Sequence, residues 1–514
     1  MGYSFSKSKY VAVYTRCHKY AWLDKYKKDE MEPVSEYTQY LFDNGHRVGD
    51  LAQKYFNVDV DVTTVREDGS LDLDAMRDKT QEHIRLGTER IAEASFSYKG
   101  FFCSVDILKR NPDDSYTIYE VKSSKHEEPP KTKRAKRHPL GVQDKYMVDA
   151  AYQQYVLANY GLNVKQVYVV LLNRDYVRGT TLDLAQYFAL CDVTKDTTAR
   201  QKEVEDTLAA LEPMLADATT EPPTVFSQNC KDCPYWGYCS RVLPTPSPFD
   251  VYYLGPGKAA EWYYKGVSFF DLPTHNADLK PAALRQIAYY NRSDAYLDKP
   301  AVQAFLDTLS YPLYSLDFET YQASIPQYEG MHTGEQVPFQ YSLHVLPSPD
   351  ADWSGMEEYA FLDLSGADTR RAIAESLVER IPAGACVLAY HESTERSIVK
   401  RLAEHCPDLA AHLLSFTYVD PLKVFQDGHY YMASMGKSFS LKTVAPALYP
   451  DDPDMDYHNL EGNVKNGTQA MNVYTKAADY TEEERQQLEE DLKKYCALDT
   501  LAVLKIIKKL YEVV

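Results

Sequence analysis

The spacing of apolar residues changes several times along the chain and predicts an alternation of helices and strands. Apolar positions recur every three or four residues over 10–26 and 35–56, which indicates two helices. Strand-like patterns follow, and the segments 101–110 and 115–124 flank an Asn-Pro-Asp-Asp turn, as expected for a hairpin. Beyond the hairpin we expect a helix at 144–159, a strand at 166–172 and a charged helix at 197–216. These elements predict an α/β domain.

A second group of elements begins at an apolar strand over residues 311–320. After it we expect strands at 338–346 and 385–390, a helix at 394–405 and a long helix at the C-terminus. A Pro-rich run at 244–250 separates the two groups. The chain is therefore expected to contain a domain at 1–245, a connecting segment at 246–304 and a second α/β domain at 305–514.

The strand at 311–320 carries two acidic residues on one of its faces. Alternation places Asp317 and Glu319 on the same side, opposite the aromatic residues of the strand. Burying two like charges is costly unless a positive charge compensates, and a divalent cation is the simplest compensation. A third acid, Asp499, lies in the apolar stripe of the C-terminal helix, with Leu488, Leu492, Tyr495, Ala502 and Ile506. The pattern predicts that Asp499 completes a metal site.

Composition narrows the possible classes of function. The 514-residue chain is 44% hydrophobic and 25% charged, with a net charge of −19. This charge argues against passive coating of nucleic acid or of anionic membranes, but it permits a nuclease with a local basic surface. No run approaches the roughly 20 apolar residues that a membrane span needs, and residues 1–30 lack the apolar core of a signal peptide. We therefore expect a cytoplasmic protein that does not contact membranes.

Candidate chemistry in the first domain lies on the predicted hairpin. Asp106 is on its first strand, and Glu120 and Lys122 share one face of the second. Two carboxylates on neighbouring strands can hold Mg²⁺ or Mn²⁺, and a lysine beside them can orient or deprotonate a water or stabilise developing charge. His46 lies upstream on a predicted helix, on the side away from the apolar stripe.

This arrangement resembles the restriction-endonuclease-like, PD-(D/E)XK core of RecB-type nucleases. The resemblance implies that His46, Asp106 and Glu120 bind the metal ion and that Lys122 is catalytic. It also implies a restriction-endonuclease-like fold for the first domain.

A basic loop and the helix after it are the candidate nucleic-acid contacts of this domain. The loop concentrates five cationic side chains: Lys131, Lys133, Arg134, Lys136 and Arg137. Directly after a metal site in so acidic a chain, such a run favours contact with phosphate over a merely solvated loop. The resemblance adds Gln153 and Tyr155 on the following helix. The family usually carries a Tyr four residues after this Gln, where the present chain has Leu157.

The nine cysteines favour metal ligation over disulfides. Cys230, Cys233 and Cys239 form a C-x2-C-x5-C run, and Cys17 stands near the start of the chain. Four thiolates can hold zinc or an iron–sulfur cluster. One Cys before the nuclease core and three after it resemble the cluster site of RecB-type and CRISPR-associated exonucleases, which implies a [4Fe-4S] cluster, with zinc as the alternative. The others are expected to be buried apolar residues: Cys103, Cys191, Cys386, Cys406 and Cys496.

The acids of the second domain resemble those of the DEDDy subgroup of RNase H-like 3′→5′ exonucleases. In that family an Asp and a Glu on the first strand and a final Asp hold two metal ions, and a Tyr one helical turn before the final Asp orients the attacking water. The matching residues here are Asp317, Glu319, Tyr495 and Asp499. The middle acid of the family opens a helix after a strand, where Glu395 fits best and Glu392 is the second candidate. The resemblance implies an RNase H-like fold.

Together the resemblances describe a bacterial family that joins a RecB-like nuclease domain to a DEDDy-like one. We therefore expect a metal-dependent nuclease that hydrolyses DNA, at single-stranded ends, in both centres. Two alternatives stay open. One centre is a degenerate nucleic-acid-binding module and the other alone is catalytic, or the protein is an RNA-processing exonuclease that uses only the C-terminal site.

Overall fold

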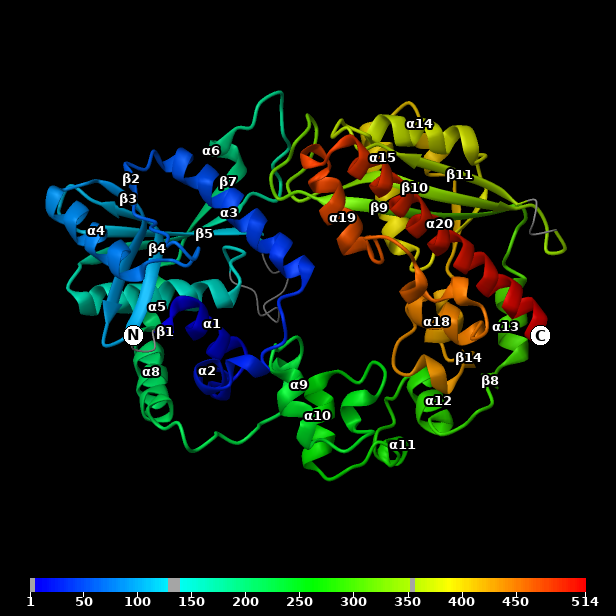
Figure 1. Ribbon diagram of the computed structural model, residues 1–514, viewed down its shortest axis with the longest axis horizontal. Helices are drawn as coiled ribbons and strands as arrows, with labels where there is room; N and C mark the ends of the chain where they lie inside the picture. Colours follow the sequence, from blue (N-terminus) through cyan, green and yellow to red (C-terminus); the bar gives the residue numbers. More distant parts are fainter. Residues whose placement is uncertain (1–4, 128–138, 352–355) are drawn as a thin grey trace. The chain divides into compact units, whose positions relative to one another are not determined.

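The computed structural model describes residues 5–127, 139–351 and 356–514 and shows a mixed α/β protein (Figure 1). The chain divides into two compact units. The first contains Met1–Val242 and Ala323–Glu335, and the second contains Leu243–Gln322 and Gln336–Val514. The whole segment expected to connect the domains, 246–304, therefore belongs to the second unit.

A seven-stranded sheet forms the centre of the first unit, in the order β2-β3-β4-β5-β6-β7, with β1 paired to β4. Strands β3, β4 and β5 are antiparallel neighbours, β6 runs parallel to β5, and β7 is antiparallel to β6. The strands are β1 (Phe5–Ser6), β2 (Val60–Asp61), β3 (Arg90–Tyr98), β4 (Phe101–Arg110), β5 (Tyr116–Lys125), β6 (Val164–Leu172) and β7 (Phe188–Asp192). The hairpin predicted from the sequence is the β4–β5 pair.

Helices cover both faces of this sheet (Figure 1). Helices α1, α5 and α8 pack in one apolar core, whereas α3 covers the opposite face through Val48 and Ala52. Ser35 caps the start of α3, and Asn57, in the left-handed region, ends it. The helices are α1 (Lys7–Thr15), α2 (His18–Tyr26), α3 (Glu36–Phe56), α4 (Leu73–Leu86), α5 (Asp144–Tyr160), α6 (Leu184–Tyr187), α7 (Thr194–Ala199), α8 (Gln201–Ala216) and α9 (Trp236–Cys239).

The second unit has a five-stranded sheet in the order β11-β10-β9-β12-β13. Its first three strands are antiparallel neighbours, and β12 and β13 run parallel to β9. The strands are β9 (Leu313–Gln322), β10 (Gln336–Leu346), β11 (Glu357–Leu362), β12 (Cys386–Leu388) and β13 (Thr417–Val419); β8 (Tyr296–Leu297) and β14 (Tyr430–Tyr431) form a separate pair.

The alternation predicted for β9 is confirmed by the packing of the second unit. Its Tyr314, Leu316 and Phe318 face α14 and α15, whereas Leu313 belongs to the core that contains α18 and α20. The helices are α10 (Pro256–Tyr264), α11 (Leu272–His275), α12 (Pro281–Tyr289), α13 (Lys299–Leu306), α14 (Arg370–Arg380), α15 (Ser393–His405), α16 (Ala410–Leu413), α17 (Leu422–Gln426), α18 (Leu441–Leu448), α19 (Gly467–Thr475) and α20 (Glu482–Val513).

The long helix α20 is fixed in register on the sheet by buried polar contacts. Thr481 and Glu484 form a capping box at its start, and all six residues of the predicted stripe are buried. The Thr500 hydroxyl lies 2.8 Å from His344 Nδ1 and 3.0 Å from Ser342 Oγ, both on β10. These contacts determine where the preceding residue, Asp499, projects.

Two predicted helices are each divided in the structure. The segment 10–26 breaks at Cys17, whose backbone is extended and begins α2, so the expectation of one continuous helix is wrong. The segment 197–216 divides at Arg200 into α7 and α8. In the described parts of the chain, we find no helix both long and apolar enough to cross a membrane.

Candidate functional site

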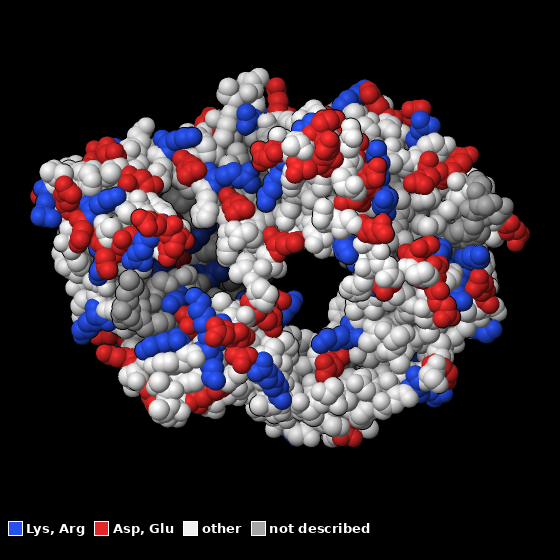
Figure 2. All heavy atoms as spheres, viewed as in Figure 1, with Lys and Arg blue, Asp and Glu red and all other residues white. Residues whose placement is uncertain are grey.

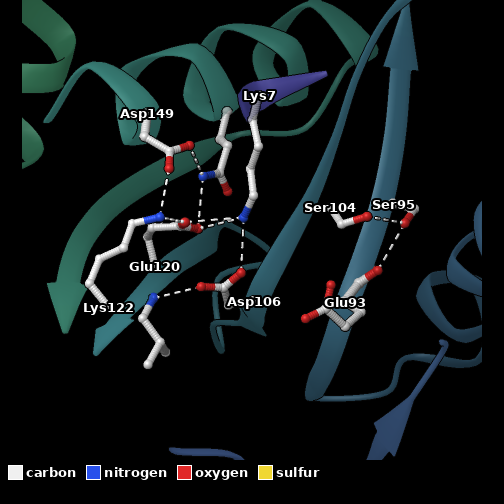
Figure 3. Close-up of polar contacts among 10 residues, drawn as sticks. Lys7, Glu93, Ser95, Ser104, Asp106, Glu120, Lys122 and Asp149 are labelled. Atoms are coloured by element: carbon white, nitrogen blue, oxygen red, sulfur yellow. Dashed lines mark hydrogen bonds and ion pairs between the residues drawn. The ribbon is translucent and has the colours of Figure 1, made fainter. Parts of the chain in front are cut away.

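The first unit brings four carboxylates together at the point where β4 and β5 separate (Figure 3). The ladder between these strands ends at the pair Ile107–Tyr119. Just beyond it, Asp106 Oδ2 accepts a 2.7 Å hydrogen bond from the backbone N–H of Val121. Glu120, on β5, is fully buried. We call the group Glu93, Asp106, Glu120 and Asp149 the N-terminal acid centre.

Two ammonium groups lie among these acids. Lys122 Nζ donates to Glu120 Oε1 at 2.5 Å and to Asp149 Oδ2 at 2.7 Å. Lys7 Nζ lies 2.9 Å from Asp106 Oδ1 and 3.1 Å from both oxygens of Glu120. Burial lowers the pKa of Lys122, but the charges of Asp149 and Glu120 outweigh it, and the net direction is upward. Lys122 is therefore held as a cation.

Helix α5 supplies the other side of the centre. The Gln153 amide Nε2 donates to Glu120 Oε2 at 2.8 Å and to Asp149 Oδ1 at 3.0 Å. Gln153 is fully buried, and its Oε1 has no hydrogen-bond partner among the described residues. Burial, followed by the charge of Glu120, raises the pKa of Asp149. The predicted residues Asp106, Glu120, Lys122 and Gln153 thus meet at one place.

Glu93 joins the centre from β3 through an unusual backbone conformation. It lies between the ladder pairs Ala92–Ile107 and Ala94–Val105, directly across from Asp106, and has a φ of 54°. Such a φ is uncommon outside glycine and occurs often at functional sites. Burial, and next the charge of Asp106, raise the pKa of Glu93 to about 8. Figure 3 shows its carboxylate beside that of Asp106.

The other predicted residues of the first domain have no described contact with this centre or lie outside the described residues. His46 is exposed on α3, and no described hydrogen bond or ion pair joins it to Asp106 or Glu120. Its role as a metal ligand stays a prediction. Tyr155 is half-buried against Tyr98, with ring centroids 6.3 Å apart. The cationic loop residues all fall outside the described residues: Lys131, Lys133, Arg134, Lys136 and Arg137.

The four predicted cluster cysteines meet where the start of α2 approaches the loop before α9. Cys17, Cys230, Cys233 and Cys239 are free thiols that line one pocket. Among the described residues no three of these sulfurs lie mutually within 4.8 Å. Burial raises the pKa of Cys233 to about 11, and it raises that of Cys17 as well. Ligation would therefore have to displace protons.

The loop that carries these cysteines is tied to α1 by an arginine. Arg16 Nη1 donates to the carbonyl of Lys231 at 2.7 Å, and Nη2 donates to that of Asp232 at 3.1 Å. The side chain thus satisfies backbone carbonyls beside Cys230 and Cys233. The end of α1 is therefore held against the cysteine loop.

The acids of the second unit gather between β9 and α20. Ligand atoms of Asp317, Glu319 and Cys496 all lie within 4.8 Å of one another. Burial, followed by the charge of Asp499, raises the pKa of Asp317 and brings that of Glu319 to about 8. Burial raises the pKa of Asp499 to about 6, although hydrogen bonds from two tyrosines lower it. The predicted group of Asp317, Glu319 and Asp499, which we call the C-terminal acid centre, is thus assembled.

Polar residues surround Asp499. The Tyr457 hydroxyl donates to Asp499 Oδ1 at 2.5 Å, and Tyr495 lies one helical turn before Asp499. The Lys442 ammonium lies 4.7 Å from the ring centroid of Tyr495 and 5.1 Å from that of Tyr457, and donates to the Lys465 carbonyl at 2.7 Å. Burial lowers the pKa of Lys442 against the opposing charges of Asp499 and two further acids. Lys442 thus faces the carboxylates without an ion pair among the described contacts.

The structure separates the two candidates for the middle acid. Glu395, in the first turn of α15, is buried, and its Oε2 has no partner among the described residues. Its charge contributes to the raised pKa of Asp317. Glu392 instead forms ion pairs with Arg396 and Lys423. The geometry therefore favours Glu395.

Both centres contain carboxylates, the ligands that Mg²⁺ and Mn²⁺ prefer. Among the described residues only the C-terminal centre brings three candidate ligand atoms mutually within 4.8 Å. The raised pKa values of Asp317 and Glu319 favour the protonated carboxyl where no cation offsets their charge. Outside the centres, acidic and basic side chains are interspersed on the face shown in Figure 2.

Several site residues were not found from the sequence. Lys7, Glu93 and Asp149 join the N-terminal acid centre, and Lys442 and Cys496 adjoin the C-terminal one. Of these residues only Glu93 has a signal in the nearby sequence, because it is an acid within the apolar strand 90–98. The buried cysteines are confirmed as buried, although Cys496 also contacts Asp317, with its Sγ 3.7 Å from Oδ2.

A comparison with models of protein families gives a match to part of the chain. Among curated proteins none matches the chain. A family model described as a domain of unknown function, DUF2779, matches residues 314–440. The matched segment includes Asp317, Glu319 and Glu395 and ends before Asp499. The comparison thus shows that about one quarter of the chain, including the strand with the paired acids, is similar to this domain.

Proposed function

We propose that the protein is a metal-dependent nuclease with a hydrolytic centre in each unit. The observation that carries this proposal is the meeting of Asp317, Glu319 and Asp499 between β9 and α20, where Glu319 and Asp499 are buried, Asp317 is half-buried and the pKa of each is raised. Acids held in this way are stabilised by a divalent cation. The order of the five-stranded sheet supports an RNase H-like fold, and the β3–β4–β5 meander followed by α5 and the parallel β6 supports a restriction-endonuclease-like one.

Mg²⁺ or Mn²⁺ bound in these centres would polarise the phosphodiester and activate the attacking water. The side chains around the C-terminal centre have separate tasks. Tyr495 orients the water, one turn before Asp499. Lys442 supplies a positive charge for the phosphate oxygens, because its ammonium faces the carboxylates. In the N-terminal centre Asp149 and Glu120 hold Lys122 as a cation, and in this state it stabilises negative charge.

The four-cysteine group is assigned a [4Fe-4S] cluster. Four thiolates can hold zinc or an iron–sulfur cluster, and Cys17, Cys230, Cys233 and Cys239 line one pocket. The order of one Cys before the acid centre and three after it, which resembles the cluster site of RecB-type exonucleases, favours the cluster. Protein purified without oxygen should be brown and contain about four irons per chain; stoichiometric zinc in colourless protein contradicts the assignment.

The proposed substrate is DNA with single-stranded ends. The test uses isosteric variants: Asp317→Asn, Glu120→Gln and the double variant, each assayed with Mn²⁺ on labelled single-stranded DNA and RNA. Glu489→Gln on α20 and Glu205→Gln on α8 are controls, since both acids are exposed. Each centre variant should lose one activity and the double variant all activity. Full cleavage by the double variant would overturn the proposal.

A second candidate function is supported by the ion pairs of the N-terminal centre. Asp106 and Glu120 already have ammonium partners, so this centre could grip nucleic acid while the other cleaves. In that case Glu120→Gln weakens DNA binding but leaves the cleavage rate of the bound substrate unchanged. Cleavage of RNA but not DNA by the wild-type protein would instead favour an RNA-processing exonuclease.

A further inference from the structure

A lysine stands at the place where the two predicted metal ligands of the first unit meet. The Lys7 ammonium contacts three carboxylate oxygens, at 2.9 Å from Asp106 and at 3.1 Å from both oxygens of Glu120 (Figure 3). A divalent cation shared by these oxygens would have to occupy the same space. Lys7 therefore acts as a cation already present between the acids.

Lys7 is held there by regular structure. It is the first residue of α1 and directly follows β1, which pairs with β4, the strand of Asp106. Phe5 in β1 is buried, and the Tyr152 hydroxyl donates to its carbonyl at 2.7 Å. Only 21% of the Lys7 side chain is exposed. The ammonium is thus a fixed part of the centre.

The net charge of the N-terminal acid centre matches one further divalent cation. With all acids ionised, four carboxylates face the two ammonium groups of Lys7 and Lys122, so two negative charges remain. One divalent ion neutralises them, whereas two would leave an excess of positive charge in a buried site.

The structure also indicates where that cation would lie. Glu93 is directly across from Asp106, and no ammonium or guanidinium of the described residues pairs with it. Like charges opposed on neighbouring strands are destabilising without a cation. The fully buried Gln153, whose Nε2 contacts Glu120 and Asp149 in the same centre, has an Oε1 with no partner among the described residues, so the centre also keeps an unfilled polar position on its α5 side.

We infer that Lys7 takes the place of a second metal ion, and that the N-terminal acid centre accepts one divalent cation, on its Glu93–Asp106 side. This inference rests on the proposed metal-dependent function. It predicts a one-metal centre in the first unit and a different metal requirement in the second.

The test counts bound Mn²⁺ in the full chain carrying Asp317→Asn, Glu319→Gln and Asp499→Asn, which neutralise the C-terminal acid centre. Electron paramagnetic resonance of unbound Mn²⁺, with calorimetric titration, should give one ion per chain. When Lys7→Met is added, the centre should bind a second Mn²⁺ ion, or its affinity for Mn²⁺ should rise at least about tenfold. The reason is that the Lys7 ammonium no longer competes for the carboxylates of Asp106 and Glu120. Lys7→Arg should retain a count of one. The matched control is Lys9→Met, whose ammonium pairs with Asp24 outside the centre.

The outcomes separate this inference from the proposed function. Two ions bound while Lys7 is intact, or unchanged binding after Lys7→Met, would overturn the inference and leave the metal centre standing. No bound ion in either chain overturns both the inference and the metal-dependent role of the first unit. If Lys7→Met does not fold, as judged by circular dichroism, the count with Lys7 intact still decides.

Discussion

The buried acids of the C-terminal centre make stability depend on pH in a direction opposite to that of ordinary salt-bridged carboxylates. Burial and then the charge of Asp499 raise the pKa of Glu319 from its usual 4.5 to about 8. Between these values the folded state keeps the proton and the unfolded chain releases it. The unfolding free energy in the absence of metal therefore falls as pH rises, by about 1.4 kcal/mol per pH unit for each such proton.

The variant Glu319→Gln lacks the titrating carboxyl. The difference between wild type and variant therefore measures how much Glu319 contributes to the pH dependence of the unfolding free energy. From about pH 5.5 to about pH 7.5 the wild-type protein should lose roughly 2.7 kcal/mol through Glu319 alone, and the variant should lose that much less. Glu395, whose pKa burial also raises to about 8, adds to the wild-type slope. Excess Mn²⁺ should flatten the wild-type slope, because the cation replaces the proton.

Hydrogen exchange of peptides from α20 measures the opening free energy of the second unit separately from the first. Samples contain either EDTA or Mn²⁺, over a series of pH values, with corrections for intrinsic exchange. Glu489→Gln, an exposed acid on the same helix, is the control and should retain the wild-type slope. Equal slopes for Glu319→Gln and the wild type, or stability that rises with pH, refute the reasoning.

Three further predictions concern contacts near the sites. Tyr457→Phe removes a hydrogen bond that lowers the pKa of Asp499, so half-maximal Mn²⁺ binding should move to higher pH, by about one unit; an unchanged pH profile contradicts this. Thr500→Val removes the hydroxyl that contacts His344 Nδ1 and Ser342 Oγ, two buried atoms on β10, and should cost about 1–3 kcal/mol in denaturant unfolding. Cys17→Ser should reduce the iron content, measured by elemental analysis, whereas Cys103→Ser, a buried cysteine away from the group, should not.

Local periodicity was sufficient for the elements that carry the C-terminal centre. Alternation along β9 and three-to-four spacing along α20 each depend only on neighbours in sequence. They placed Asp317, Glu319 and Asp499 on inward faces, and the structure brings these faces together. The hairpin acids and Gln153 were found in the same way, with help from the family resemblance.

Contacts between distant segments could not be read from such patterns. Lys7 reaches Asp106 and Glu120 across 99 and 113 residues, and nothing near Lys7 marks it as a partner. Lys442 lies more than 50 residues before Asp499 in the sequence, yet its ammonium faces the carboxylates after the chain folds back. The break at Cys17 was hidden because apolar residues continue on both sides of it.

Helix α1 connects the N-terminal acid centre to the cysteine loop of the first unit. It begins at Lys7 in the acid centre and leads to Arg16 and Cys17 at the cysteine loop, roughly 15 Å away along a helix axis. If the proposed cluster is present, oxidative loss of its iron would release the C-terminal end of α1 and loosen the position of Lys7. The affinity of the acid centre for a divalent cation would then depend on the redox state of the surrounding solution.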